Sequence, residues 1–281
     1  MTVATLAEVL QPALSGHYAV AGLVTLGWED MRAVVAAAEA ENAPVILQAG
    51  PGCREHTPLP IIGKMFQHLA ESASVPVVAH LDHGYSYAEC KQAVDCGFTS
   101  VMYDGSRKPL LQNIDETAAI VALAHASGVS CEGEIGFVGY AEGEDSTGTN
   151  AEEASRFALE TKVDAMAISV GNVHLQENKQ VGLDEQQISA IESVTDVPLV
   201  IHGGSGVPED QRLRLSRTTS ICKWNVGTEL RKVFGQALRN SINSDGNRFD
   251  RVAILKETHA PLMNATRCVL QSVSSEQRIK G

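Results

Sequence analysis

Three histidines and one aspartate stand where apolar runs of the sequence end. The run at 75–84 ends in "AHLDHG", which contributes Asp82 and His83, and the runs at 163–174 and 197–206 reach His174 and His202. Three neutral imidazoles with an open fourth position describe a catalytic zinc site, in which the vacancy takes water or a substrate oxygen. A single histidine is more often a hydrogen-bonded polar residue than a ligand, so the prediction depends on their shared placement.

Further ionisable side chains end neighbouring runs. Asp104 follows the run at 99–106 and Glu134 the run at 129–136. Either carboxylate could be an alternate metal ligand or could orient a liganding imidazole, and for Asp104 a buried salt bridge is an equal alternative. His80 shares its run with Asp82, and we expect it to support the site from behind rather than to react.

Glycine-rich stretches close the last two runs, "HGGSG" at 202–206 and "NVGTE" at 225–229. Glycine lets backbone N–H groups approach an anion closely, and Ser and Thr hydroxyls add donors. "GGSG" alone is a common turn, but the two stretches together predict a phosphate site. The ligand is then a phosphorylated small molecule whose oxygen reaches the metal.

These residues need a fold that brings distant strand ends together. Eight apolar, β-branched runs alternate with segments of helical periodicity, at 18–24, 43–50, 75–84, 99–106, 129–136, 163–174, 197–206 and 219–228. Eight such units predict an α/β fold, a (β/α)8 TIM barrel, whose active site lies at the carboxyl ends of the strands. We expect a single domain over 1–281, with an N-terminal helix at 3–14 and a helical tail from about residue 250.

Composition limits the partners and the compartment. The 281 residues carry 34 acidic and 22 basic side chains, a formal net charge of −12, which argues against nucleic acid or an anionic membrane as partner. No apolar run reaches the roughly 20 residues that span a bilayer, and the N-terminus does not resemble a signal peptide. The six cysteines form no C-x-x-C pair. We therefore expect free thiols and a cytoplasmic protein.

In this order, "HLDHG", "GFTSVMYDGS", "EGEIG", "AISVGNVH", "HGGSGVP" and "NVGTELR" resemble the class II, zinc-dependent ketose-bisphosphate aldolases, over about residues 18 to 240. The resemblance implies one Zn²⁺ per subunit, held by His83, His174 and His202, with Glu134 as an alternate ligand. It implies that Asp82 transfers a proton at the carbinol oxygen where the C–C bond breaks. Glu142, in the acidic loop "GYAEGEDSTG", would be the base at the enediolate carbon, although such a loop is often only solvated.

The same resemblance implies reversible cleavage of a ketose 1,6-bisphosphate or a related phosphorylated ketose to dihydroxyacetone phosphate and an aldehyde. Zinc would polarise the ketone and stabilise the enediolate, because no strand end offers a Schiff-base lysine and Lys223 lies mid-strand. A monovalent cation, Na⁺ or K⁺, near the phosphate and a homodimer or homotetramer are further implications. The dihydroxyacetone phosphate moiety would be held by Gly203, Gly204, Ser205, Asn225, Val226, Gly227 and Thr228.

The sequence departs from the family pattern around the substrate pocket. Val24 stands where the first strand usually ends in Asn, and the loop usually written Gly-Gly-x-Glu-Asp is Gly139–Gly143 here. Leu175 replaces a Gly, and "KQVGLD" at 179–184 replaces a Lys-x-Pro-x-Leu-Asp segment. We therefore expect an acceptor aldehyde other than glyceraldehyde 3-phosphate. For a second phosphate, Arg107 and Lys108 are candidates.

Two alternatives remain. The first is another metal-dependent enzyme on the same barrel, a hydrolase, isomerase or other lyase. Such barrels commonly carry a His-x-His after the first strand, and residues 18–24 offer none. The second is a non-catalytic sugar-phosphate-binding subunit, which we would expect to have lost its ligands or its Asp, whereas this chain retains both.

Overall fold

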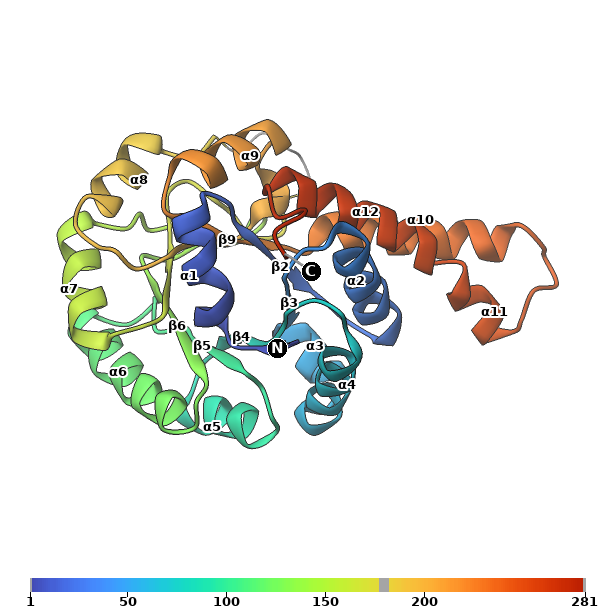
Figure 1. Ribbon diagram of the computed structural model, residues 1–281, viewed down its shortest axis with the longest axis horizontal. Coiled ribbons are helices and arrows are strands. Elements are labelled where there is room, and N and C mark those ends of the chain that lie inside the picture. Colours follow the sequence, from blue (N-terminus) through green and yellow to red (C-terminus); the bar gives the residue numbers. More distant parts are fainter. Residues whose placement is uncertain (1, 177–181, 280–281) are drawn as a thin grey trace.

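The predicted barrel is present in a computed structural model that describes residues 2–176 and 182–279. Eight parallel strands pair in chain order from β2 to β9, and the β2–β9 and β4–β5 pairings close the cylinder (Figure 1). The strands are β2 (Val20–Val24), β3 (Val45–Ala49), β4 (Val77–Gly84), β5 (Ser100–Tyr103), β6 (Ser130–Ile135), β7 (Ala165–Ile168), β8 (Leu199–Ile201) and β9 (Ile221–Val226). Each strand lies inside one of the eight apolar runs and is shorter than its run, because polar and glycine residues at several run ends belong to the loops.

The N-terminus differs from the expectation of one helix over 3–14. Residues Val3–Ala4 form a short strand, β1, which pairs with β4 through Val3↔Val77, and helix α1 runs from Leu6 to Gly16. Thr5 and Glu8 form a capping box, which explains why the helix begins after Thr5. Two residues of strand carry no periodicity, so local sequence could not reveal β1.

Helix α1 closes the amino end of the barrel. Leu6, Val9, Leu10 and Ala13 are buried in one cluster with interior side chains of the strands, among them Val20. Figure 1 shows α1 lying across this end, with both chain termini nearby. Apolar side chains therefore fill the amino end of the barrel, and the polar residues of the candidate site lie toward the carboxyl ends of the strands.

Helices surround the barrel and bury a second, larger core between themselves and the strands. They are α2 (Trp28–Glu41), α3 (Pro51–His56), α4 (Leu59–Ser72), α5 (Tyr87–Asp95), α6 (Leu110–Ala126), α7 (Ala151–Thr161), α8 (Glu185–Glu192), α9 (Glu209–Thr218), α10 (Thr228–Asn243), α11 (Arg251–Lys256) and α12 (His259–Ser272), with a 3₁₀ turn, η1, at Gly204–Gly206. Within the described ranges, no helix has the length and apolarity needed to cross a bilayer.

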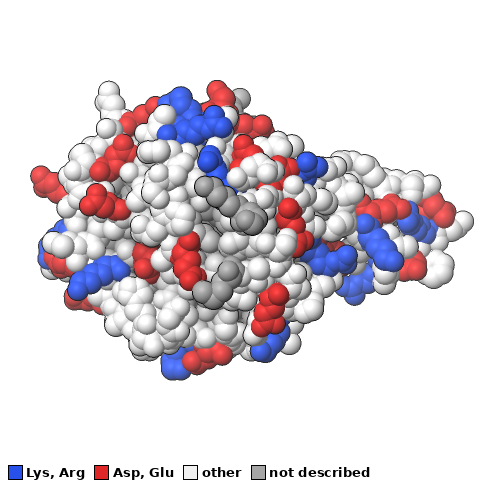
Figure 2. Space-filling model, in the orientation of Figure 1, with Lys and Arg blue, Asp and Glu red and all other residues white. Residues whose placement is uncertain are grey.

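The helical tail expected from about residue 250 consists of α11 and α12. Helix α12 returns to the barrel and buries Val269 and Leu270, whereas no residue of α11 is buried. Figure 1 shows α10 and α11 projecting beyond the barrel as an arm. On the face drawn in Figure 2, basic and acidic side chains are interspersed rather than gathered into one basic surface.

Candidate active site

The three predicted histidines meet at the carboxyl end of the barrel. Their ring centroids lie 5.1 Å apart for His83 and His174, 4.7 Å for His83 and His202, and 5.5 Å for His174 and His202. One ring nitrogen of each lies within 4.8 Å of the others. The strand ends of β4 and β8 and the segment after β7 thus converge as the barrel topology requires.

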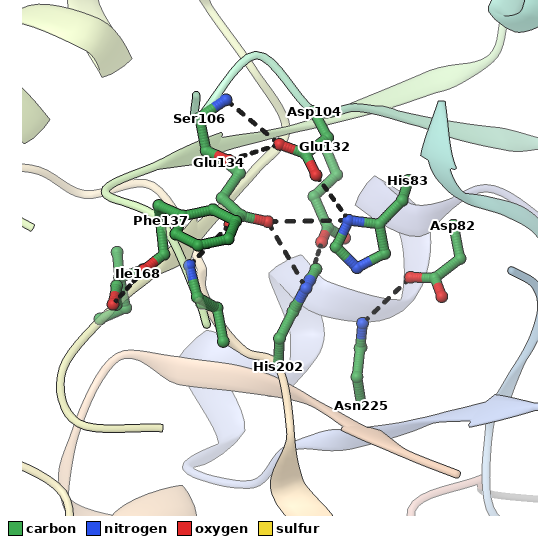
Figure 3. A network of polar contacts seen from close by, with 12 residues as sticks. Asp82, His83, Asp104, Ser106, Glu132, Glu134, Phe137, Ile168, His202 and Asn225 are labelled. Atoms are coloured by element: carbon green, nitrogen blue, oxygen red, sulfur yellow. Dashed lines mark hydrogen bonds and ion pairs between the residues drawn. The ribbon is translucent and has the colours of Figure 1, made fainter. Parts of the chain in front are cut away.

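Asp104 lies beside His83 and accepts a hydrogen bond from its Nδ1 at 2.8 Å (Figure 3). The other oxygen of Asp104 accepts from the backbone and hydroxyl of Ser106, at 3.1 and 2.6 Å. Burial opposes the charged carboxylate, but the His83 and Ser106 bonds hold the pKa of Asp104 below its usual range. An ionised Asp104 holds a proton of His83 on Nδ1, so Nε2 would be the nitrogen that binds a ligand, and the supporting role of Asp104 stays a prediction.

Glu132 performs the same function for His202, which the sequence did not suggest. Glu132 Oε1 lies 3.1 Å from His202 Nε2, and its Oε2 accepts a hydrogen bond from Lys223 Nζ at 2.6 Å. All three side chains are fully buried. His80 lies behind them, with Nε2 3.5 Å from Lys223 Nζ and Nδ1 2.8 Å from Ser100 Oγ. Lys223 is thus a fixed counter-ion inside the barrel.

Among the described residues, four buried polar atoms near the site have no hydrogen-bond partner: Oε1 of Gln48 and Oδ1 of Asn225, beside Asp82, and Nδ1 of His202 and Oε2 of Glu134, beside His83. The last two bear on a metal site. They lie 3.6 Å apart, and Glu134 Oε2 is 3.9 Å from His83 Nδ1 (Figure 3). Unpaired buried polar atoms are costly and need an explanation. The donor set of three imidazoles and one carboxylate is the kind that zinc binds, so the residues fit the predicted ion.

The electrostatics of the imidazoles also fit a cation. Burial and the charge of His83 lower the pKa of His174 to about 3 and hold the pKa of His202 well below its ordinary value, so both are neutral. Burial opposes a charged His83, but Asp82 and Asp104 raise its pKa to about 9. Burial, with the nearby Asp104 charge, raises the pKa of Glu134 to about 8. The charges of Asp82 and Asp104 thus surround His83, the one imidazole that stays protonated, and a metal cation at this place would meet the same favourable charges in place of that proton.

Asp82 lies at the same strand end as His83 and lines the same cavity as His83 and His174. Its Oδ1 accepts hydrogen bonds from Gln48 Nε2 at 3.2 Å and from Asn225 Nδ2 at 3.3 Å. The two amides hold one carboxylate oxygen and leave the other available. Gln48 was not foreseen, because a Gln inside an apolar strand resembles an ordinary buried polar residue.

The two glycine-rich stretches lie side by side across this cavity. Gly203, Ser205, Asn225, Gly227 and Thr228 line it, whereas Gly204 and Val226 are buried behind them. The Ser205 hydroxyl accepts from the backbone N–H groups of Gly227 and Glu229, at 3.3 and 3.4 Å, so its own proton is free to be donated. The α10 amino terminus adds a positive dipole end to this cradle.

Glu142 lies near the tip of an exposed loop rather than in the cavity. Backbone hydrogen bonds of 2.8 Å between Phe137 and Thr147 close the loop. The His174 N–H donates to the carbonyl oxygen of Gly139 at 2.8 Å, and the Ala141 N–H donates to the carbonyl oxygen of His174 at 3.0 Å. The Tyr140 ring stacks on His174 with centroids 5.1 Å apart and lines the cavity, but Glu142 does not. Glu142 lines an adjacent hollow instead.

The residues at which the sequence departs from the family pattern surround the cavity. Val24 and Leu175 line it, and Leu175 has a positive φ of 57°. Arg107 and Lys108 do not line it: Arg107 pairs with Glu144, and Lys108 with Glu116. Of the segment 179–184, residues 179–181 lie outside the described residues.

Basic charge reaches the cavity through Arg231, at the end of the first turn of α10. Among the described side chains that line the cavity, it is the only lysine or arginine. Its position beside the cradle suits an anionic ligand, and sequence inspection missed it because one Arg on an amphipathic helix is unremarkable.

Comparisons with known proteins agree on one family. A family profile described as "Fructose-bisphosphate aldolase class-II" matches residues 4–278. The chain is 37% identical to a 6-phospho-5-dehydro-2-deoxy-D-gluconate aldolase of Shouchella clausii, over 90% of this chain and 88% of the relative. It is 38% identical to a fructose-bisphosphate aldolase of Geobacillus stearothermophilus, over 89% of each. The crystal structure of the YdjI aldolase from Escherichia coli K12 superposes with a TM-score of 0.86 at 26% identity, covering 99% of this chain and 100% of that one.

Proposed function

The chain belongs to the class-II fructose-bisphosphate aldolase family, and from this premise we propose that it cleaves a phosphorylated ketose to dihydroxyacetone phosphate and an aldehyde. Family membership makes it an aldolase, a carbon–carbon lyase acting on a phosphorylated sugar. We propose three further things: which ketose is cleaved, that zinc is the metal, and which residue takes each role.

One observation carries the proposal: a single cavity is lined by His83, His174, Asp82 and the glycine cradle. The cavity thus brings candidate ligands for a Lewis acid, a carboxylate and a candidate phosphate site within reach of one small molecule. That arrangement suits a substrate that carries a phosphate close to the ketone.

We assign the metal site to His83 Nε2, His202 Nδ1 and the imidazole of His174, with Glu134 as an alternate ligand. The unpaired Nδ1 of His202 and Oε2 of Glu134 support this assignment. When bound there, zinc supplies a Lewis acid for the substrate carbonyl. One Zn²⁺ per subunit is expected, and a monovalent cation near the phosphate remains part of the proposal.

Asp82 accepts the proton of the hydroxyl that lies β to the ketone. The C–C bond then breaks, the hydroxyl carbon leaves as the aldehyde, and the electron pair remains on the carbon next to the ketone. Gln48 and Asn225 keep the Asp82 carboxylate aimed through hydrogen bonds to its Oδ1. Such positioned acid–base groups contribute about 10²- to 10⁴-fold to a rate.

A proton must then return to the carbon that kept the electron pair, and we assign this step to Glu142. Its loop would have to move, because Glu142 lines the hollow beside the cavity and not the cavity itself. Loops that close over bound substrate also exclude water from the reaction. Glu142→Gln should therefore slow solvent proton exchange at this carbon of dihydroxyacetone phosphate more than it weakens phosphate binding.

Two substrate types deserve direct comparison. One is a ketose 1,6-bisphosphate, of fructose or tagatose. The other is 6-phospho-5-dehydro-2-deoxy-D-gluconate, the compound in the name of the Shouchella clausii relative. Cleavage of its C3–C4 bond gives dihydroxyacetone phosphate and 3-oxopropanoate, an acceptor with a carboxylate in place of a second phosphate. Two residues of the cavity favour this second substrate. Arg231 is the single cationic side chain among the described cavity residues, and Val24 is apolar, so the cavity offers little to bind a second phosphate.

The test measures dihydroxyacetone phosphate release from each compound by a coupled reductase. Activity should disappear in EDTA and return with Zn²⁺, and substituting K⁺ or Na⁺ by a bulky organic cation should reduce it. Dihydroxyacetone phosphate from none of the three compounds would contradict the proposal. Binding of phosphoglycolohydroxamate without any turnover would favour a non-catalytic subunit.

Asp82→Ala separates chemistry from metal binding. We expect kcat to fall by about 10²- to 10⁴-fold, because the proton acceptor is lost, while zinc content stays at the wild-type level. Asp95→Ala, an exposed carboxylate on α5 paired with Lys91, is the control and should leave both unchanged. Retained turnover in Asp82→Ala would remove the assigned role.

A further inference from the structure

Arg54, on helix α3, binds the backbone at the ends of two barrel strands. Its Nη1 donates to the carbonyl oxygens of Ala49, at the end of β3, and of Asp82, at 2.7 and 2.6 Å. Its Nη2 donates to the carbonyl oxygen of His83 at 2.9 Å. One side chain thus joins the backbones of the proposed proton acceptor and a proposed metal ligand.

The guanidinium of Arg54 is itself fixed from the other side. Glu89, on α5, accepts from Arg54 Nε at 3.0 Å and from Nη2 at 2.8 Å. The second oxygen of Glu89 accepts from the backbone N–H of Tyr85 at 2.8 Å. The side chain of Arg54 is 8% exposed and that of Glu89 is 28% exposed. A planar guanidinium with five donors in a fixed fork can make all these bonds at once.

The backbone that Arg54 holds is in an uncommon conformation. His83 has φ of 54°, in the left-handed region, and the β4–β5 register shifts between Leu81 and Gly84. A residue other than glycine keeps such a conformation only where its surroundings over-determine it. The Asp82 and His83 carbonyls belong to the peptide planes before and after His83, so holding both fixes its φ and ψ.

We propose that Arg54 is a positioning residue that holds His83 in its metal-binding conformation and sets Asp82 beside it. This inference rests on the proposed function, because it assumes that His83 binds the metal and that Asp82 moves the proton. Arg54 does not line the cavity and therefore acts only through the backbone that it binds. Through that backbone it fixes the distance between metal and proton acceptor.

The variants Arg54→Met and Arg54→Lys test the inference. Zinc affinity, measured by competition with a chelator, should fall by about 10- to 100-fold, the usual effect of losing a residue that orients a metal ligand. kcat at saturating zinc should also fall, because Asp82 loses its place. KM should change little, since the phosphate cradle lies on the loops after β8 and β9. Lysine should not rescue, because one ammonium cannot bond three carbonyls and Glu89 together.

Arg214→Met is the matched control. Arg214 makes a two-pronged pair with Glu185, at 2.8 and 2.6 Å, on the exposed surface. Its loss should change neither zinc affinity nor kcat. Circular dichroism establishes that each variant is folded before zinc is titrated. If both Arg54 variants fail to fold, Glu89→Gln decides, because a loosened guanidinium should weaken zinc binding in the same direction by a smaller factor.

Unchanged zinc affinity in folded Arg54→Lys, or in Glu89→Gln where that variant decides, overturns the inference. Zinc affinity and activity that fall equally in Arg214→Met also overturn it. The proposed function can fail separately: wild-type protein that binds zinc but cleaves no ketose phosphate would contradict the aldolase assignment. Weakened zinc binding in Arg54→Lys would still support Arg54 as the residue that holds His83.

Discussion

Lys223 and Glu132 show at the scale of single residues how this barrel stabilises polar groups in its interior. Both side chains are fully buried, and their Nζ–Oε2 distance is 2.6 Å. A buried ion pair offers little net stability over apolar side chains, but removing one partner leaves an uncompensated charge. The pair nevertheless has a use here, because it presents Glu132 Oε1 to His202. The buried pair therefore orients a ligand of the proposed metal site rather than adding stability.

Lys223→Met should lower the free energy of unfolding by about 3–5 kcal/mol, because Glu132 is left buried and unpaired. Denaturant unfolding of the zinc-free protein measures this. The double variant Glu132→Leu with Lys223→Met should recover part of the stability, since no charge is stranded, yet still bind zinc weakly. A Lys223→Met protein as stable as wild type, or a double variant no more stable than the single one, would contradict this account.

Sequence patterns pointed to residues at or near strand ends and missed Gln48 and Lys223 inside strands and Arg54 on a helix. Asp82 and His83 stand out because ionisable groups follow an apolar run and the fold dictates where they meet. Gln48 and Lys223 lie within strands buried on both faces, so no alternation tells the barrel interior from the helix-facing side. Arg54 acts through long-range bonds to carbonyl groups, which leave no local pattern.

At the scale of elements, the turn after β8 depends on a glycine for two separate reasons. Gly203 has φ of 67°, and a Cβ there would lie 2.1 Å from the carbonyl oxygen of Val173. The turn therefore presses directly against the segment that leads to His174. The sequence predicted from "HGGSG" a close approach of backbone N–H groups to a phosphate, which stays a prediction, and it gave no sign of the contact with Val173.

Gly203→Ala should raise KM for the phosphorylated substrate and lower stability by more than the roughly 1–3 kcal/mol of left-handed strain alone. Gly128→Ala is a matched control: its φ is 69°, and a Cβ there meets nothing within 4 Å. The excess loss of unfolding free energy in Gly203→Ala over Gly128→Ala measures the clash with Val173. Equal losses in both variants, with unchanged KM, would argue against a role for this turn.

At the scale of the whole molecule, the cysteines are spread over the fold as free thiols and form no disulfide. All six are free; Cys53, Cys90, Cys131 and Cys222 are buried, whereas Cys268 is exposed. Burial raises the pKa of Cys53 to about 11 and those of Cys90 and Cys222 to about 12. The expected free thiols are therefore present, and most are both inaccessible and protonated.

A thiol reagent at pH 8 should label Cys268 first, and Cys268→Ser should remove this fast phase. Because a raised pKa keeps the thiol protonated, Cys53 should stay slow to react until the pH nears 11 or the chain unfolds. Peptide mapping by mass spectrometry assigns each labelled position. Rapid labelling of Cys53 at pH 8 in the folded protein would show that the cavity of the candidate active site, which Cys53 lines, opens more than the structure indicates.

The arm of α10 and α11 carries exposed apolar side chains that a partner subunit could cover. Phe249 is 92% exposed and Val252 is 61% exposed, and apolar side chains including Trp28 and Phe234 line a cavity at the base of the arm. Isolated exposed apolar residues are ordinary, but several apolar side chains gathered on a projecting element are typical of an oligomer interface. The homodimer or homotetramer expected from the family resemblance would bury it.

Light scattering after size-exclusion chromatography should therefore give a mass at least twice that of one chain, and Phe249→Asp should shift it toward the monomer. Leu159→Asp is the control, because Leu159 is 77% exposed on α7, away from the arm, and its replacement should leave the mass unchanged. The substitution at Phe249 should also lower activity if the partner covers the cavity that adjoins the active site. A monomeric wild-type protein, or a Phe249→Asp oligomer of unchanged mass, would exclude the arm as the interface.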